Sequence, residues 1–205
     1  MTGMFITIEG IDGAGKTTQC RLLAAALRAR GVEVAETREP GGTPAAEAIR
    51  KLVLETEGLD AVEQALLMMA ARRSNVVQNV LPALDAGRWV VQDRGLASTY
   101  AYQICQTPKI HRDEAWRQLE VLNCIPPYPD LTLWLDIDVS MALQRARSRG
   151  GNVFEANSLD YHYSVSNAFQ TWADRYCGSV SRIDGTGPVD TVHQRIMHEV
   201  TSRLS

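Results

Sequence analysis

Cysteine is scarce in this sequence and is never paired. Four cysteines occur among the 205 residues, and they stand singly at positions 20, 105, 124 and 177. Zinc sites and disulfide frameworks need cysteines in close pairs or at high density. We therefore expect reduced thiols, and neither a zinc site nor a disulfide scaffold.

Long hydrophobic runs and a strong net charge are also missing. No apolar run approaches the roughly 18 residues that span a bilayer, and the N-terminal segment lacks the basic start and apolar stretch of a signal peptide. These absences predict a cytoplasmic protein. The net charge of −3 gives no basic field for duplex DNA or an anionic membrane. We expect small-molecule partners, no nucleic acid and no membrane.

Strand and helix patterns alternate along the whole chain. A content of 45% apolar residues is enough to form a core, and no repeat, linker or low-complexity tract divides residues 1–205. The sequence predicts a single domain of the α/β class, with a doubly wound five-stranded parallel sheet flanked by helices. The expected strands are 4–8, 32–36, 89–93, 131–135 and 180–183. The expected helices include 19–30, 44–55, 60–86, 113–122 and 159–176, with others starting near 140 and 189.

Residues 10–18 read GIDGAGKTT and directly follow the first expected strand. The spacing of Gly10, Gly15, Lys16 and Thr17 fits the phosphate-binding loop of nucleoside triphosphate enzymes. Glycines let the backbone curl so that its N–H groups point at one anion. Lys16 supplies a point charge for the β and γ phosphates, and Thr17 supplies a hydroxyl for magnesium. The predicted ATP-binding residues are Gly10, Gly13, Ala14, Gly15, Lys16, Thr17 and Thr18.

Three more stretches accompany this loop. They read TREPGGTP at 37–44, DRGLASTYAYQ at 93–103 and PDLTLWLDID at 129–138. In their order and separation, the four stretches resemble the thymidylate kinase family of P-loop nucleoside monophosphate kinases, over nearly the whole chain. The resemblance implies the fold of those kinases with a short lid at about 145–157, Mg²⁺ as cofactor, ATP as phosphoryl donor, a pyrimidine deoxynucleoside monophosphate as acceptor, and a homodimer.

The resemblance also implies roles for residues around the phosphates. Arg94 would bridge donor and acceptor phosphates, since a guanidinium offers a planar fork of donors. Asp93 would hold the water shell of the metal. Asp12 would contact either the 3′-hydroxyl of the acceptor or the magnesium shell. The predicted catalytic residues therefore include Lys16, Asp12 and Arg94, and the predicted metal residues are Thr17, Asp93 and Asp12. A structural ion pair for Asp93 and Arg94, and a turn role for Asp12, remain as alternatives.

The acceptor site follows from the same resemblance. Arg38 would face the monophosphate, Arg73 would bind the thymine carbonyl, and Met69 falls where the family has an aromatic that stacks on the base. A surface salt bridge for Arg38 and a solvated side chain for Arg73 are the alternatives. The implied acceptor residues are Arg38, Glu39, Pro40, Met69, Arg73, Arg94, Ser98, Thr99, Tyr102 and Gln103.

The sequence departs from the family pattern in the acceptor pocket and in the lid. Met69 and Gly95 stand where the family has larger rings, which would open the base pocket. The stretch GGNVFE at 150–155 lacks the arginine that such lids carry. We expect Arg147 or Arg149 to replace that cation in catalysis, because its loss can cost several powers of ten in rate.

Three hypotheses follow from these patterns. The first is Mg-dependent transfer of the ATP γ-phosphoryl group to dTMP, giving dTDP. The second keeps this chemistry with a 5-modified pyrimidine such as 5-hydroxymethyl-dUMP, because of Met69 and Gly95. The third is a catalytically inactive nucleotide-binding module, suggested by the missing lid arginine.

Overall fold

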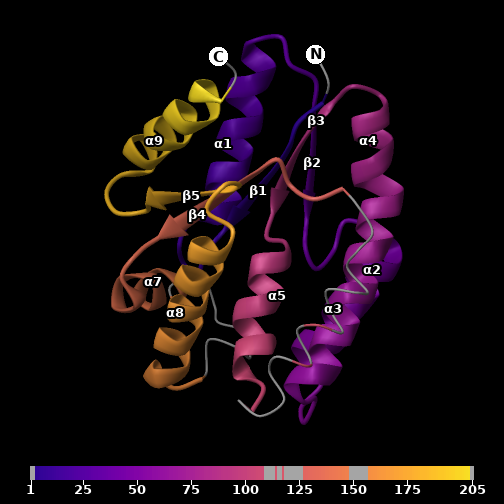
Figure 1. Ribbon diagram of the computed structural model, residues 1–205, viewed down its shortest axis with the longest axis vertical. Helices are drawn as coiled ribbons and strands as arrows, with labels where there is room; N and C mark the ends of the chain where they lie inside the picture. The colour runs from indigo at the N-terminus through magenta and orange to yellow at the C-terminus, as the bar shows by residue number, and fades with distance from the viewer. Residues whose placement is uncertain (1–2, 109–113, 115–116, 118–126, 148–156, 204–205) are drawn as a thin grey trace.

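Five parallel strands form the centre of the molecule. The computed structural model describes residues 3–108, 114, 117, 127–147 and 157–203. The strands are ordered β2-β3-β1-β4-β5 and all neighbours are parallel (Figure 1), as the sequence predicts. They are β1 Phe5–Glu9, β2 Val34–Arg38, β3 Trp89–Asp93, β4 Leu131–Asp136 and β5 Val180–Asp184.

Helices connect the strands in the described parts of the chain. The predicted long helix at 60–86 consists of three consecutive parts, because a π-helical segment, η1, interrupts it. The predicted helix at 113–122 lies almost wholly outside the described residues. Within the part of the chain that is described, no helix is both long and apolar enough to cross a membrane. The helices are α1 Lys16–Ala29, α2 Pro44–Glu55, α3 Ala61–Asn75, η1 Val76–Val80, α4 Leu81–Asp85, α5 Leu96–Tyr102, η2 Ile104–Gln106, α7 Val139–Arg147, α8 Leu159–Arg175 and α9 Val189–Ser202.

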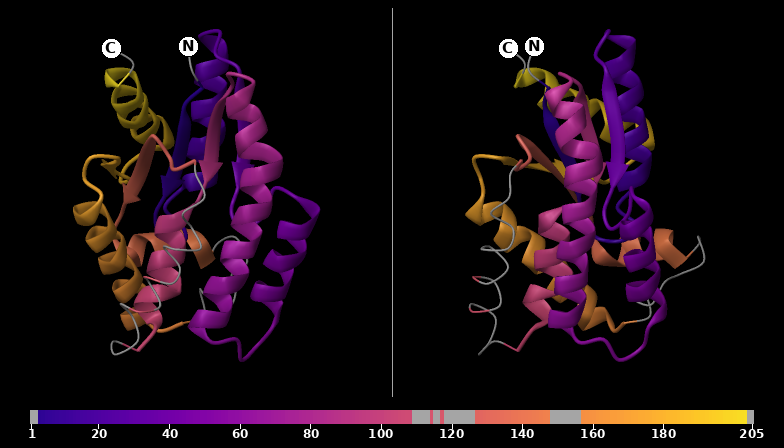
Figure 2. Two further views of the ribbon diagram at one scale, coloured as in Figure 1. Left: turned by 45° about the vertical axis from the view of Figure 1, so that its right-hand side comes forward. Right: turned by 90° about the vertical axis from the view of Figure 1, so that its right-hand side faces the viewer.

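Both faces of the sheet are covered by helices. Helices α1 and α9 pack together, α1 against β1, β2 and β3 and α9 against β5, while η1, α4 and α8 pack on β2, β3 and β5 respectively. Figure 2 shows helices on both sides of the sheet. Because the central strands are buried on both faces, they read as near-continuous apolar runs, such as LTLWLD in β4.

The strand order positions the functional residues. The chain passes from β1 to the β2-β3 side and then returns to the β4-β5 side, so β1 lies where the order reverses. In open α/β sheets, ligands bind at the carboxyl ends of the strands beside such a point. Ile8 of β1 pairs with Asp93 of β3. The segments that follow these strands, the glycine loop and Arg94, are therefore neighbours.

Candidate active site

A glycine loop joins β1 to α1. Gly13 has φ +84°, and a Cβ there would lie 1.9 Å from the carbonyl oxygen of Ala142, so only glycine fits. The first turn of α1 carries no acidic residue, and Gly15 at its N-cap makes no side-chain hydrogen bond. The amides at this helix start therefore have no capping side chain, and helix N-termini of this kind bind anions.

Lys16 places a cation inside the loop. Its side chain is buried, and its ammonium donates a hydrogen bond of 2.8 Å to the carbonyl of Ile11. Burial, together with the charge of Arg94, lowers the pKa of Lys16 to about 8. Lys16 is therefore positively charged below that pH and interacts strongly with an anion in its poorly hydrated surroundings.

Arg94 connects the glycine loop to the neighbouring pocket. Its amide donates to the carbonyl of Ile8 at 2.9 Å, and its Nη1 donates to the carbonyl of Gly10 at 3.2 Å. Nη2 forms an ion pair with Asp12. Burial alone would lower the pKa of Arg94, but Asp12, Tyr102, Asp93 and Glu9 together outweigh burial and the pKa is raised. A permanently charged planar donor group thus lies against the phosphate loop.

Asp12 and Tyr102 pack around this guanidinium. The Asp12 amide donates to the Tyr102 hydroxyl at 3.0 Å, and the ring of Tyr102 lies 5.1 Å from the Arg94 guanidinium carbon. Burial raises the pKa of Tyr102. Burial would raise the pKa of Asp12 as well, but the charges of Arg94 and Lys16 hold it below its ordinary value. Tyr102 is therefore neutral and Asp12 ionised at neutral pH.

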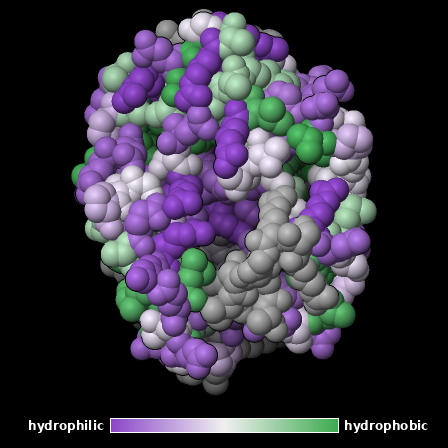
Figure 3. Space-filling view, turned by 180° about the vertical axis from the view of Figure 1, so that it is seen from behind, coloured by the Kyte–Doolittle hydropathy of each residue, from purple (hydrophilic) through white to green (hydrophobic). Residues whose placement is uncertain are grey.

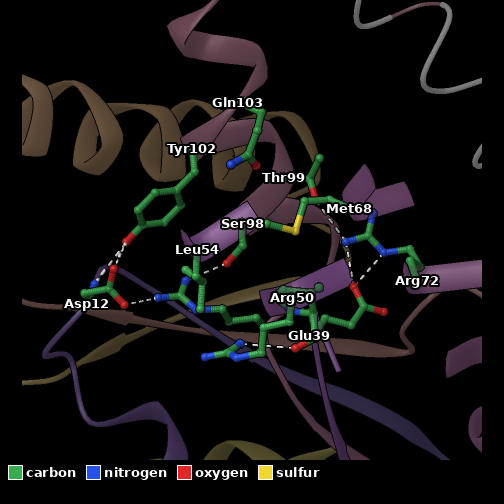
Figure 4. A pocket seen from close by; sticks show the side chains of 13 residues that line it. Asp12, Glu39, Arg50, Leu54, Met68, Arg72, Ser98, Thr99, Tyr102 and Gln103 are labelled. Atoms are coloured by element: carbon green, nitrogen blue, oxygen red, sulfur yellow. Dashed lines mark hydrogen bonds and ion pairs between the residues drawn. The ribbon is translucent and has the colours of Figure 1, made fainter. Parts of the chain in front are cut away.

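A pocket opens beside Arg94, between α2, α3 and α5. Figure 4 shows Arg72, Glu39 and Thr99 joined at one end of it, and Asp12 with Tyr102 at the other. The pocket is mixed in character, with several charged groups among apolar walls. It is lined by Asp12, Glu39, Pro40, Arg50, Leu54, Met68, Arg72, Arg94, Gly95, Ser98, Thr99, Tyr102 and Gln103.

A buried ion pair closes one end of the pocket. Arg72 donates from Nε to Glu39 at 2.7 Å and from Nη2 to the Thr99 hydroxyl at 3.1 Å. The side chains of Arg72 and Glu39 are 10% and 6% exposed. Fixed polar groups of this kind at a pocket wall provide orientation and specificity for a ligand.

Arg50 brings a second arginine to the pocket. Its Nη1 donates to the carbonyl of Pro40 at 3.1 Å. Burial lowers the pKa of Arg50, and the charges of Arg38 and Arg94 lower it further. Two guanidinium groups, Arg50 and Arg94, thus line one cavity, where an anionic group would relieve their repulsion.

Thr17 and Asp93 provide oxygen ligands next to the loop. The Thr17 hydroxyl donates to Asp93 at 2.5 Å. Within the described residues, no three histidine, cysteine or acidic side chains cluster as metal ligands. One carboxylate and one hydroxyl beside a phosphate site fit Mg²⁺, which keeps several waters and takes its other ligands from phosphates. Hydrophilic side chains of the described residues line a hollow on the face that Figure 1 turns away from the viewer (Figure 3).

Comparison with known proteins identifies the family. The thymidylate kinase family model matches residues 8–196. The chain is 38% identical to a thymidylate kinase of Psychrobacter sp. (strain PRwf-1), over 98% of this chain and 99% of that protein. It is 41% identical to a thymidylate kinase of Rhizorhabdus wittichii over the full length of both. The crystal structure of thymidylate kinase from Ehrlichia chaffeensis superimposes with a TM-score of 0.76 at 30% identity, covering 98% of this chain and 99% of that one.

The chain belongs to the thymidylate kinase family. It is accordingly a phosphotransferase of the nucleoside monophosphate kinase class. Eight residues predicted from the resemblance do line the pocket, and they lie on the glycine loop, on the loop after β2, after β3 and on or just after α5. They are Asp12, Glu39, Pro40, Arg94, Ser98, Thr99, Tyr102 and Gln103.

Two residues predicted from the resemblance lie one position away from residues that line the pocket. Arg73, which is exposed, and Met69 line a second, smaller cavity, whereas Met68 lines the pocket and Arg72 lines both. Successive residues on a helix point about 100° apart, so a shift of one position exchanges a pocket side chain for a neighbour. The sequence does contain a signal for Arg72. It lies seven residues, or about two helical turns, after the buried Ala65, so the two residues share one face of α3.

Arg38 lies outside the pocket, whereas the resemblance implies that it faces the monophosphate. It pairs with Glu47 at 2.9 Å, its side chain is 53% exposed, and it does not line the pocket. Arg50, which the sequence analysis did not single out, lies there instead. Its position four residues after the buried Ala46 on α2 is the signal that could have identified it.

Most of the predicted lid at about 145–157 lies outside the described residues. Helix α7 ends at Arg147, whose side chain is not described, and residues 148–156, including Arg149, lie outside the described residues. The roles of Arg147 and Arg149 therefore stay predictions.

Proposed function

We propose that the protein transfers the γ-phosphoryl group of ATP to dTMP, with Mg²⁺ as cofactor, giving ADP and dTDP. The observation that carries this proposal is the position of Arg94, whose guanidinium bonds the phosphate loop at Gly10 and also lines the neighbouring pocket. One cation thereby serves two anion sites. Phosphoryl transfer requires this alignment and charge neutralisation more than a protein nucleophile.

Each side of the reaction has its own set of residues. On the donor side, the loop amides and Lys16 bind the triphosphate. On the acceptor side, Arg50 and Arg94 bind the monophosphate, while Arg72, Thr99 and other polar groups of the pocket meet the edge of the pyrimidine. An acceptor phosphate oxygen attacks the γ-phosphorus, and the bond to the β–γ bridging oxygen breaks. Arg94 offsets the charge that spreads over the transferred group.

Thr17 and Asp93 are the residues that would hold magnesium. When bound, the ion neutralises phosphate charge and orients the triphosphate. Asp12 is bonded to Arg94 and Tyr102, so a role in holding the sugar and the guanidinium agrees better with its contacts than direct metal ligation.

A coupled assay of ADP release tests the proposal. The purified protein is given ATP, Mg²⁺ and a panel of monophosphates that includes dTMP, dUMP, dCMP, dAMP and UMP. The largest kcat/KM should be for dTMP, and EDTA should abolish turnover. No stimulation by any pyrimidine deoxynucleotide would contradict the proposal. ATP binding without transfer to any nucleotide would support the inactive-module hypothesis instead.

A second candidate acceptor is a pyrimidine with a 5-substituent larger than methyl. Gly95, Glu39 and Arg72 line both the main pocket and a second cavity of about 50 Å³. A Cβ at Gly95 would lie 3.4 Å from Thr7 and 3.5 Å from Gln92, so alanine would fit and would narrow this space. If the cavity receives a substituent, Gly95→Ala should lower kcat/KM for 5-ethyl-dUMP about tenfold more than it lowers kcat/KM for dTMP. Equal effects on both nucleotides would count against this candidate.

We also propose a cytoplasmic homodimer, as the family resemblance implies. Large apolar side chains are exposed along the neighbouring helices α2, α3 and η1, namely Leu52, Val62, Leu66 and Val77. Burial of such side chains stabilises dimers. Light scattering after gel filtration should give twice the chain mass, and Leu66→Glu should give a monomer. A monomeric wild-type protein would contradict this part of the proposal.

A further inference from the structure

Arg94 has an unusual backbone conformation. Its φ is +68°, and it is the one non-glycine residue with a positive φ among those that the structure describes. Such a conformation is unfavourable for a residue with a Cβ, so surrounding contacts must maintain it. Strained residues of this kind cluster at functional sites.

Two buried side chains hold the peptide that links Arg94 to Gly95. The Arg94 carbonyl accepts a hydrogen bond of 2.8 Å from Nε2 of Gln92, and the Gly95 amide donates one of 2.7 Å to Oε1 of Glu9. Gln92 and Glu9 are each 1% exposed. Rotation of this peptide would leave buried polar groups without partners, which is strongly disfavoured. Strand β3 holds the amide of Arg94 and these bonds hold its carbonyl group, so together they restrain φ and ψ of Arg94 and thereby the direction of its side chain.

Glu9 also controls the other end of Arg94, through Ser98. The Ser98 hydroxyl donates to Oε2 of Glu9 at 2.5 Å and accepts from Nη1 of Arg94 at 2.8 Å. The Ser98 amide donates to Oε1 of Glu9 at 3.0 Å. One carboxylate therefore orders both the backbone after Arg94 and the hydroxyl that receives its guanidinium.

Gln92 is held by its own partners. Its Oε1 accepts from Nδ2 of Asn75 at 2.9 Å, and Oδ1 of Asn75 accepts from the Thr37 hydroxyl at 2.6 Å. Asn75 is fully buried. These bonds leave Nε2 of Gln92 facing the Arg94 carbonyl, and they extend the network to β2, the strand that leads into the loop at 37–44.

We propose that Glu9 and Gln92 are positioning residues, which hold the peptide between Arg94 and Gly95 and thereby keep the Arg94 guanidinium against the phosphate loop. This inference rests on the proposed function, in which Arg94 contacts the transferred phosphoryl group. Neither side chain lines the main pocket, although Gln92 lines the second cavity beside it. With dTMP as acceptor, we expect their effect on catalysis to pass through Arg94.

Crystal structures of Gln92→Leu and Glu9→Met test the geometry without reference to activity. In a variant that has lost its positioning residue, Arg94 should leave the left-handed region or lose its contact with Gly10. Loss of that geometry in either variant supports the proposal. Retention of both features in the two variants overturns it. Gln92→Glu, which keeps the side-chain volume but removes the donor, replaces Gln92→Leu if that protein does not fold.

A double-mutant cycle with Arg94→Ala tests the kinetic consequence. In the wild-type background, Gln92→Leu and Glu9→Met should each lower kcat about tenfold or more and change the KM for ATP by less than about threefold. In the Arg94→Ala background, each should change kcat by less than about twofold. Single-turnover measurements at high enzyme concentration can determine the low rates expected in the Arg94→Ala background. Effects of equal size in the two backgrounds, or no effect on kcat in either variant, would overturn the proposal.

Gln106→Leu provides a matched control. Gln106 donates hydrogen bonds to the Ala101 carbonyl and the Ser164 hydroxyl, and neither bond involves Arg94. Its removal should lower the melting temperature and leave kcat unchanged within about twofold in both backgrounds. If the wild-type protein phosphorylates no monophosphate, the proposed function fails, while the crystal structures still decide whether Glu9 and Gln92 position Arg94.

Discussion

The guanidinium of Arg94 lies 3.2 Å from the carbonyl oxygen of Gly10, so an arginine at the end of β3 touches the phosphate loop that follows β1. The two residues are 84 positions apart in the sequence. Parallel pairing of β1 and β3 brings them together, because the carboxyl ends of the two strands meet at one edge of the sheet. A single cation can therefore act on anions at the loop and in the adjacent pocket.

The first prediction concerns this arginine. Arg94→Lys keeps the charge but loses the planar fork of donors, and it should lower kcat about 100-fold or more. The far-ultraviolet circular dichroism should remain that of the wild type. Steady-state kinetics with saturating ATP and acceptor measure the effect. A decrease in kcat of less than about threefold would mean that Arg94 does not contact the reacting phosphates.

The second prediction separates Arg50 from Arg38. Arg50 lines the pocket, whereas Arg38 forms an exposed pair with Glu47. Arg50→Ala should raise the acceptor KM about tenfold or more, because a charge-assisted hydrogen bond to phosphate is lost. Arg38→Ala should change it by less than about threefold, since exposed pairs contribute little. A larger increase in the acceptor KM for Arg38→Ala than for Arg50→Ala would instead identify Arg38 as the monophosphate ligand.

A third prediction compares adjacent arginines on α3. Arg72→Met leaves Glu39 buried without its partner, which should lower the free energy of unfolding by about 3–5 kcal/mol and raise the acceptor KM. Arg73→Met alters an exposed side chain and should change stability by no more than about 0.5 kcal/mol. Urea unfolding of the two variants and the wild type provides the comparison. Similar decreases in the free energy of unfolding for both variants would argue against a buried pair between Arg72 and Glu39.

The fourth prediction is a pH dependence of stability in the nucleotide-free protein. Burial lowers the pKa of Lys16 from 10.5 to about 8, so between these values the unfolded chain binds more protons than the folded one. The free energy of unfolding should therefore rise with pH in this window, by up to about 3 kcal/mol relative to Lys16→Met, which cannot titrate. Urea denaturation of both proteins between pH 7 and 10 measures the difference. Parallel curves for the two proteins would show that the Lys16 pKa is not depressed.

Several local features could be predicted from the sequence because neighbouring residues produce them. Thr43 accepts from the Ala46 amide at the start of α2, and Asp60 forms a capping box with Glu63 on α3. Both caps depend on chemistry within one helical turn. The five strands were predicted within two residues of their observed ends, since their apolar runs are bounded by turn residues.

Other features of the site depend on how distant elements pack. Nothing within the sequence of α2 brings Arg50 to Arg94, because that approach depends on the packing of α2 against α3. The assignment of Arg72 rather than Arg73 likewise depends on the rotation of α3 about its own axis, which buries one arginine with Glu39 and exposes the next.

The sequence by itself determined the family, the parallel sheet and the phosphate loop, because these depend on the spacing of nearby residues and on the alternation of strand and helix patterns. Only the tertiary structure decided which arginines share one pocket and how the peptide after Arg94 is held. Those arrangements arise from the burial of charged and polar groups contributed by separate strands and helices, and burial is a property of the assembled fold.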